Sequence, residues 1–74
     1  MIKLGIYRHY KGNIYEVIGV ANHSETLEKM VVYRSIKNKD ELWVRPISMW
    51  NEEVILPDNS KVLRFTLIEE YDAK

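Results

Sequence analysis

The stretch that decides the fold is Gly5–Val20, with the sequence GIYRHYKGNIYEVIGV. Apolar and polar residues alternate on both sides of a Gly12-Asn13 corner. Alternation with a period of two residues, broken by a glycine-containing pair, is typical of a tight antiparallel hairpin. We therefore expect strands over residues 5–11 and 14–21.

The sequence does not decide between two registers of this hairpin. In a two-residue turn at the corner, His9 faces Glu16, and the carboxylate would raise the pKa of the histidine. In a three-residue loop with Gly12 in the left-handed conformation, Tyr7 faces Tyr15 instead. The choice matters because a one-residue slip moves every side chain to the other face.

Three further strands are expected downstream, at residues 29–36, 41–45 and 62–68. Pro46 cannot donate to a ladder and ends the fourth strand, and residues 47–51 form one helical or 3₁₀ turn. The connections are expected at residues 22–28, 37–40 and 57–60. This order predicts an all-β fold, a small five-stranded SH3-like barrel with one short helical turn before the last strand. An OB-like barrel is the alternative.

The chain of 74 residues is expected to form one small β-barrel domain over residues 1–74, with a flexible tail at residues 69–74. A domain of this size buries only about 60–65% of its unfolded surface, so its core is thin, and a homodimer is one way to complete it. The chain has no cysteine, so neither a disulfide nor a thiolate zinc site supports the fold. The sequence indicates no cofactor and no metal.

Charge and hydropathy argue against two classes of binding partner, nucleic acids and membranes. Eleven basic and eleven acidic residues cancel, which argues against non-specific binding of nucleic acid. No apolar run approaches the ~20 residues that span a bilayer, so no membrane partner is expected. The first residues lack the apolar region of a signal peptide, and the expected location is the cytoplasm.

Alternation also predicts which side chains face the core. If the arginines of the strands point outward, the inner set is Val31, Tyr33, Leu42, Val44, Leu63, Phe65 and Leu67. Trp43 then lies beside Arg45 on the outer face. A large ring outside the core needs a cover or a ligand, which makes Trp43 the marker of a candidate site.

Catalytic motifs are weak. His23-Ser24-Glu25 places a base, a nucleophile and a carboxylate side by side, but triad geometry requires residues from separate elements to converge. A polar loop is therefore the preferred interpretation, and we do not expect an enzyme. The enzyme alternative is a small hydrolase or transferase that uses His23, Glu25 and His9, and it predicts both histidines at one cleft.

Aromatic and arginine side chains instead suggest a binding module. Each of four predicted strands carries one arginine in an alternating pattern, and rings flank these arginines. Such a surface could bind a protein, a peptide or a small polar ligand. The preferred surface comprises Tyr7, His9, Arg34, Trp43 and Arg45. An RNA-binding module is the second alternative, and it predicts a basic face and an affinity that falls steeply with salt.

Several motifs together resemble one protein family. They are Gly5-x-Tyr7-Arg8-His9-Tyr10-Lys11-Gly12-x-x-Tyr15-x-Val17, His23-Ser24-Glu25-Thr26, Val32-Tyr33-Arg34 and Leu42-Trp43-Val44-Arg45-Pro46. Over about Gly5 to Phe65 the chain is similar to domain of unknown function family 1653, a group of small bacterial proteins. The resemblance implies a stand-alone cytoplasmic domain without an established activity. The polar and aromatic positions that match its motifs, and are the ligand-binding candidates, are Tyr7, Arg8, His9, Tyr15, His23, Glu25, Tyr33, Arg34, Trp43 and Arg45.

Overall fold

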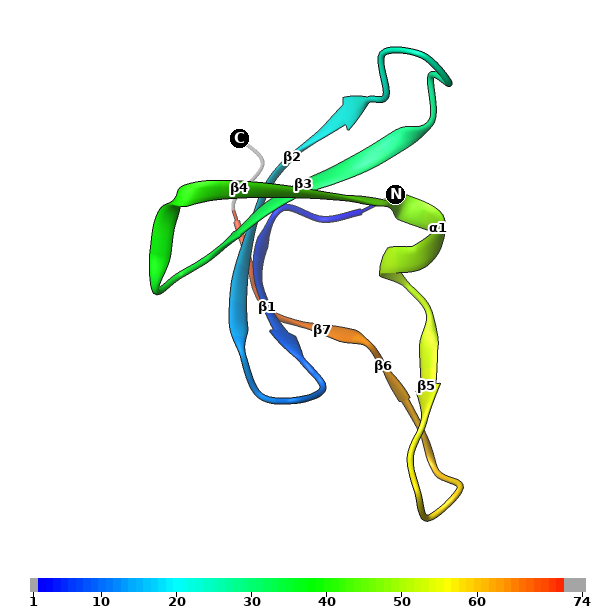
Figure 1. Ribbon diagram of the computed structural model, residues 1–74. Helices are drawn as coiled ribbons and strands as arrows, with labels where there is room; N and C mark the ends of the chain where they lie inside the picture. Colours follow the sequence, from blue (N-terminus) through cyan, green and yellow to red (C-terminus); the bar gives the residue numbers. More distant parts are fainter. Residues whose placement is uncertain (1, 72–74) are drawn as a thin grey trace.

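The computed structural model describes residues 2–71, which form a curved antiparallel sheet with a small hairpin beside it (Figure 1). In chain order the elements are β1 (Gly5–His9), β2 (Ile14–Asn22), β3 (Lys29–Ser35), β4 (Asn38–Pro46), α1 (Ile47–Trp50), β5 (Glu53–Ile55), β6 (Lys61–Leu63) and β7 (Phe65–Glu70). The five-stranded sheet has the order β4-β3-β2-β1-β7, and β5 pairs with β6 alone. The all-β prediction and the short helical turn after Pro46 are confirmed.

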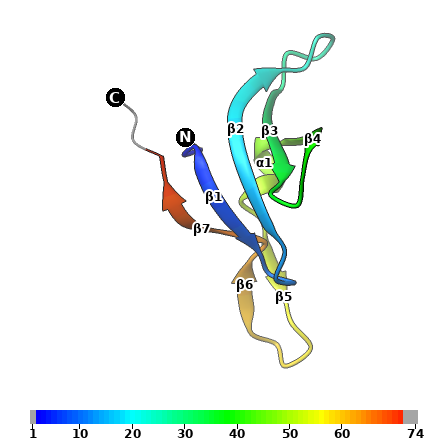
Figure 2. The same cartoon turned by 90° about the vertical axis from the view of Figure 1, so that its left-hand side faces the viewer.

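The sheet does not close into the predicted barrel. Within the described residues no ladder joins β4 to β7, and these strands form the two edges of the sheet (Figure 2). The chain leaves β4 at Pro46, passes through α1 into the β5–β6 hairpin and returns as β7 beside β1 only. The predicted five strands thus form one sheet that stays open between β4 and β7, because the last strand does not reach the fourth.

The first hairpin adopts the three-residue loop. Tyr7 lies opposite Tyr15, and the His9 N–H donates to the carbonyl oxygen of Asn13 at 2.8 Å. Gly12 has a φ of +107°, a value that L side chains rarely adopt. The His9–Glu16 pairing of the alternative register does not form, because the two residues belong to opposite faces.

Arg64 separates what the alternating pattern at 62–68 presented as one strand. The Arg64 N–H donates to the carbonyl oxygen of Glu52 at 2.9 Å, while its own carbonyl accepts from the Tyr10 N–H at 2.9 Å. The residues before Arg64 therefore pair with β5, and those after it pair with β1. Arg64 is the junction between the two sheets.

Two other boundaries differ from the expected ones. β4 begins at Asn38 and not at residue 41, because Asn38 already pairs with Ser35 across a two-residue turn. At the other end of the chain, β7 runs to Glu70, and the Tyr71 N–H donates to the carbonyl oxygen of Leu4 at 2.9 Å. Residues 69–71 of the predicted tail are thus held in or against the sheet, and residues 72–74 lie outside the described residues.

Aromatic side chains dominate the core. Its buried members are Tyr7, Val17, Val31, Trp50 and Phe65. Trp50 comes from α1, which packs against β3 and β4, and its ring stacks on Phe65 with centroids 3.8 Å apart. A four-residue helix is not stable alone, so this stacking holds α1 against the sheet.

The predicted inner set is correct on two strands, β3 and β7, and wrong on β4 and β6. Val31, Tyr33, Phe65 and Leu67 pack in or against the core. Leu42, Val44 and Leu63 are instead 57%, 58% and 47% exposed. The register pairs Tyr33 with Trp43 and Val31 with Arg45, so Trp43 and Arg45 share the core side of the sheet. The assumption that Arg45 points outward inverted the phase of β4.

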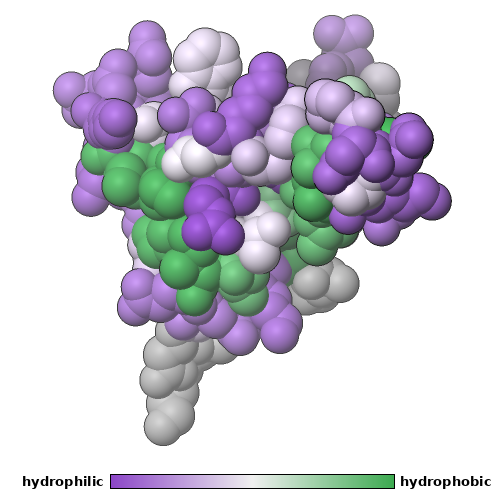
Figure 3. Space-filling model, turned by 90° about the horizontal axis from the view of Figure 1, so that it is seen from below, coloured by the Kyte–Doolittle hydropathy of each residue, from purple (hydrophilic) through white to green (hydrophobic). Residues whose placement is uncertain are grey.

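Much apolar surface remains uncovered on so small a chain. The view from below shows apolar patches interrupted by hydrophilic side chains (Figure 3). Between residues 2 and 71, no helix is long and apolar enough to cross a bilayer.

Candidate functional site

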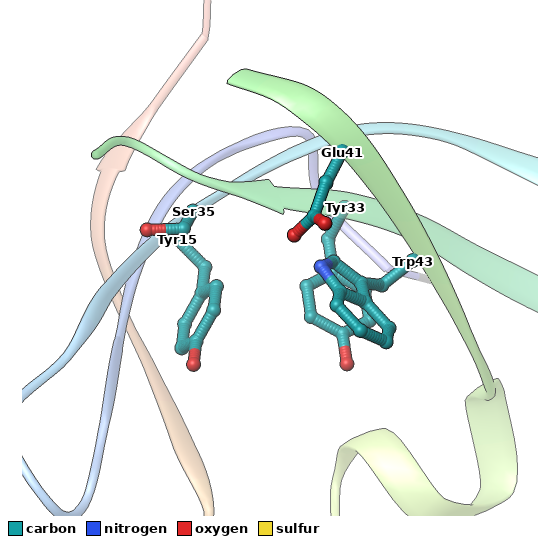
Figure 4. A pocket seen from close by; sticks show the side chains of 5 residues that line it. All are labelled: Tyr15, Tyr33, Ser35, Glu41 and Trp43. Atoms are coloured by element: carbon teal, nitrogen blue, oxygen red, sulfur yellow. The ribbon is translucent and has the colours of Figure 1, made fainter. Parts of the chain in front are cut away.

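A hollow of about 390 Å³ opens on the core side of the sheet, lined by Tyr15, Tyr33, Ser35, Glu41 and Trp43. β2, β3 and β4 contribute these side chains. The Tyr15 ring lies on one side, and the rings of Tyr33 and Trp43 lie on the other (Figure 4). We call these five residues the aromatic hollow.

Strand register explains why these residues meet. Tyr15 pairs with Ser35, and Tyr33 pairs with Trp43, so both pairs project to the same side. The Tyr15 and Tyr33 rings meet edge to face, with centroids 5.5 Å apart. Both rings also contact the buried Phe65, at 5.9 and 6.1 Å. The floor of the hollow is therefore fixed by the core, whereas Trp43 stands open to solvent.

Glu41 supplies the charge of the hollow. Its carboxylate points into the hollow beside Trp43 (Figure 4). Among residues 2–71 the Glu41 side chain forms neither an ion pair nor a hydrogen bond. An unpaired carboxylate beside aromatic faces attracts a cation, because the faces also carry negative electrostatic potential.

Two nitrogen-bearing side chains, Arg45 and His9, lie against Phe65 next to the hollow. The Arg45 guanidinium lies over the Phe65 ring, 5.7 Å from its centroid, and the His9 ring lies 5.0 Å from the same centroid. Partial burial lowers the pKa of His9, and the positive charges of Arg64, Lys11 and Arg45 lower it further. The direction of this pKa shift is opposite to the one that a Glu16 partner would have caused.

Arg34 belongs to a cluster on the opposite face. Its Nε donates to Glu16 Oε1 at 2.8 Å, and the Tyr71 hydroxyl donates to the other carboxylate oxygen. The hydrogen bonds from Tyr71 and Arg34 hold the pKa of the Glu16 carboxyl below its usual range. The bond to Glu16 raises the pKa of Tyr71 to about 12. These contacts tie β7 to β2 and β3 and give Arg34 a structural role.

His23 and Glu25 lie in the loop between β2 and β3. His23 Nδ1 accepts from the N–H of Glu25 at 3.2 Å and of Thr26 at 3.3 Å, so the imidazole caps its own turn. The nine residues of β2 separate this loop from the end that carries His9. Eight steps of ~3.3 Å give a span of about 26 Å for an extended strand. The convergence of both histidines that the hydrolase or transferase alternative needs is not present.

The predicted site residues thus divide into five groups. Tyr15, Tyr33 and Trp43 line the aromatic hollow. His9 and Arg45 border it through Phe65, and Tyr7 is buried in the core beneath. Arg8 and Arg34 lie on the opposite face, and His23 and Glu25 lie in the loop. Sequence reasoning missed Ser35, because only the observed register brings it beside Tyr15. It also missed Glu41, which alternation alone places on the same face of β4 as Trp43.

The donor chemistry offers no metal centre in the described part of the chain. Between residues 2 and 71, no three His, Asp or Glu side chains lie close enough to hold one ion.

Comparisons with known proteins give a family and a fold. Residues 5–67 match the model of a family described as protein of unknown function (DUF1653). No match to a curated protein was found. The chain is similar to the crystal structure of a DUF1653 protein from Bordetella bronchiseptica, with 31% sequence identity and a TM-score of 0.82. That similarity covers 99% of this chain and 95% of the other.

Proposed function

The chain belongs to the DUF1653 family of proteins of unknown function, and from that premise we propose that it is a non-catalytic binding module whose ligand enters the aromatic hollow. The group that fits the hollow best is an organic cation, an ammonium or a guanidinium of a peptide side chain or of a small polar molecule. One observation carries the proposal, namely an unpaired carboxylate among three rings that come from three strands.

The physical basis is the cation–π interaction. A cation within about 6 Å of a ring centroid gains ~0.5–1 kcal/mol at an exposed site and about 2 kcal/mol when desolvated. The hollow offers Tyr15, Tyr33 and Trp43 together with the Glu41 charge. Tyrosine and tryptophan also lose little entropy on binding, because they have two rotatable bonds, and Tyr15 and Tyr33 here rest on a packed core.

Ser35 supports the non-catalytic part of the proposal. Its Oγ accepts a hydrogen bond from the Lys37 N–H at 3.1 Å. Among the described side chains no base reaches this hydroxyl, so it lacks the partner that activates a nucleophile. The same carboxylate at Glu41 would repel the phosphates of RNA, which weighs against the nucleic-acid alternative.

Two further expectations remain parts of this proposal. The SH3-like arrangement is supported by the position of β1 between β2 and the last strand, and by the helical turn after β4. The cytoplasmic location is consistent with the lack of cysteine.

Titration with choline tests the cation, with its neutral carbon analogue dimethylbutanol as the matched ligand. We expect choline, and not the analogue, to shift the NMR signals of the Trp43 indole and of the Tyr15 and Tyr33 rings. Glu41→Gln should weaken the choline response about fivefold or more. Glu53→Gln, an exposed acid on β5, is the matched control.

A second pair of variants tests whether the Trp43 ring is needed for binding. Trp43→Ala should abolish the response, whereas Leu42→Ala on the opposite side of the same strand should retain it. Equal responses to choline and to its neutral analogue, or a response that survives Trp43→Ala, would refute the proposal.

A further inference from the structure

β4 is an edge of the main sheet, with β3 on one side and no strand on the other among residues 2–71 (Figure 2). An edge strand presents a row of unpaired N–H and C=O groups that can pair with another chain. β4 runs for nine residues, from Asn38 to Pro46, and is long for an edge.

The edge is protected at its two ends and open at its centre. Pro46 and the charged residues 39–41 flank it, which are devices that discourage pairing. Between them, Leu42, Trp43 and Val44 are each more than half exposed. Three consecutive apolar residues on an edge cover both faces of the strand, so a partner strand could bury apolar surface on either side.

We propose that a second copy of this chain adds its β4 antiparallel to this edge, about a two-fold axis at Trp43. In that register Glu41 lies opposite Arg45 of the partner subunit, and the reciprocal pair forms on the other side of the axis. On the outer face Leu42 lies opposite the partner's Val44. The segment Glu41–Arg45 is therefore self-complementary in charge and in hydropathy.

Both charged groups lack a partner of opposite charge in the part of the chain that the structure describes. Among residues 2–71 neither Glu41 nor Arg45 takes part in an ion pair, and Arg45 Nε is buried without a hydrogen-bond acceptor. Pairing of the edges supplies an opposite charge to each at cross-strand distance. Directly opposed unlike charges stabilise a sheet, and like charges destabilise it.

Charge also fixes the register. A shift by two residues in either direction places Glu41 or Arg45 opposite Trp43 and breaks both ion pairs. A one-residue slip would place the core side of one copy beside the outer side of the other. The two-fold arrangement at Trp43 is thus the only register within two residues that keeps both ion pairs.

This inference rests on the β4 edge and stands without the proposed ligand. The two would interact, because the partner's Arg45 is then the cation closest to the Glu41 side of the aromatic hollow. Choline binding is measured on the ring signals, and self-association is measured by mass, so one can fail while the other holds.

Charge reversal tests the pairing by sedimentation velocity over a range of protein concentration. We expect the natural chain to show a monomer–dimer equilibrium. Glu41→Arg alone, or Arg45→Glu alone, should raise the dissociation constant about 30-fold or more, because each creates two like-charge contacts. The double variant Glu41→Arg/Arg45→Glu should restore the dimer. An equal mixture of the two single variants should form a heterodimer, since its opposed charges are again unlike.

Hydrogen exchange in the natural chain provides a readout without mutation. The amide protons on the free side of β4 within residues 42–44 should exchange more slowly as the concentration rises, while those of the 23–28 loop should not change. Circular dichroism of each variant confirms that it is folded.

Three results would overturn the inference. The first is a natural chain that stays monomeric at every soluble concentration, with no slowing of exchange. The second is a dimer that all four chains form equally, which would place the interface elsewhere. The third is a series of growing polymers, which would indicate head-to-tail pairing of β4 with β7 of the next molecule.

Discussion

Replacement of Trp50 by alanine should cost more stability than any other single truncation of the core. The Trp50 side chain is fully buried, stacks on Phe65 at 3.8 Å, and meets Tyr7 and Tyr33 edge to face at 5.4 and 5.0 Å. Truncation of a buried tryptophan to alanine costs about 3–5 kcal/mol, and aromatic pairs add ~0.5–1.5 kcal/mol each. The whole domain has a stability of about 4–11 kcal/mol at ~0.05–0.15 kcal/mol per residue. Trp50→Ala should therefore leave the chain largely or wholly unfolded at 25 °C.

Trp50→Phe is the discriminating variant. The indole Nε1–H of Trp50 is buried without a hydrogen-bond acceptor. Removal of a buried unsatisfied donor recovers about 1–3 kcal/mol, which offsets much of the packing that phenylalanine loses. We expect a net loss below about 2 kcal/mol in urea unfolding followed by circular dichroism. If Trp50→Ala lost less than ~1 kcal/mol, or if Trp50→Phe lost as much as alanine, the stacked core would not be the main source of stability.

The other predictions concern pH and glycine. The bond to Glu16 raises the pKa of Tyr71 to about 12. The contribution of Tyr71 to stability is therefore fully present below pH 10 and is lost as the pH rises through 12. In a pH titration followed by phenolate absorbance, one tyrosine should ionise later than the others. The lowered pKa of Glu16 affects stability at acidic pH, where its contribution is present above pH 4.5 and is lost as the pH falls further. Tyr71→Phe should therefore reduce the acid dependence of the free energy of unfolding measured in urea. Gly5→Ala should destabilise the chain by more than about 1 kcal/mol, since φ is +150° and a Cβ would lie 2.1 Å from the Glu69 carbonyl oxygen. Gly19→Ala, where a Cβ meets nothing within 4 Å, should change the melting temperature little.

The sequence was informative wherever a local pattern had a single structural meaning. Alternation located β1, β2 and β3, and Gly12 required a loop that tolerates positive φ. Pro46 marked the end of β4, as expected for a residue that cannot donate to a ladder. The β5–β6 hairpin escaped notice because its strands have three residues each, too few for a period to appear.

The error on β4 has a specific physical cause. Arg45 was taken as a marker of the solvent face, but its guanidinium lies over the Phe65 ring. Arginine stacks on rings readily, so it is a poor guide to direction on an aromatic sheet. Even with the phase inverted, Trp43 was recognised as a site residue. Glu41 lies two residues earlier on the same strand and therefore shares its face, so alternation alone carried a signal for Glu41.

The neighbours of β1 have a consequence for how this protein is made. β1 lies between β2 and β7, so β1 is synthesised well before the strand that covers its second edge. At ~5–20 residues per second, several seconds pass in which the Tyr7 edge is uncovered in the nascent polypeptide. Fragments that stop before residue 65 lack the strand that shields it, and are expected to be recognised by chaperones or degraded. A split reporter divided in that region would register folding only when both halves have been synthesised.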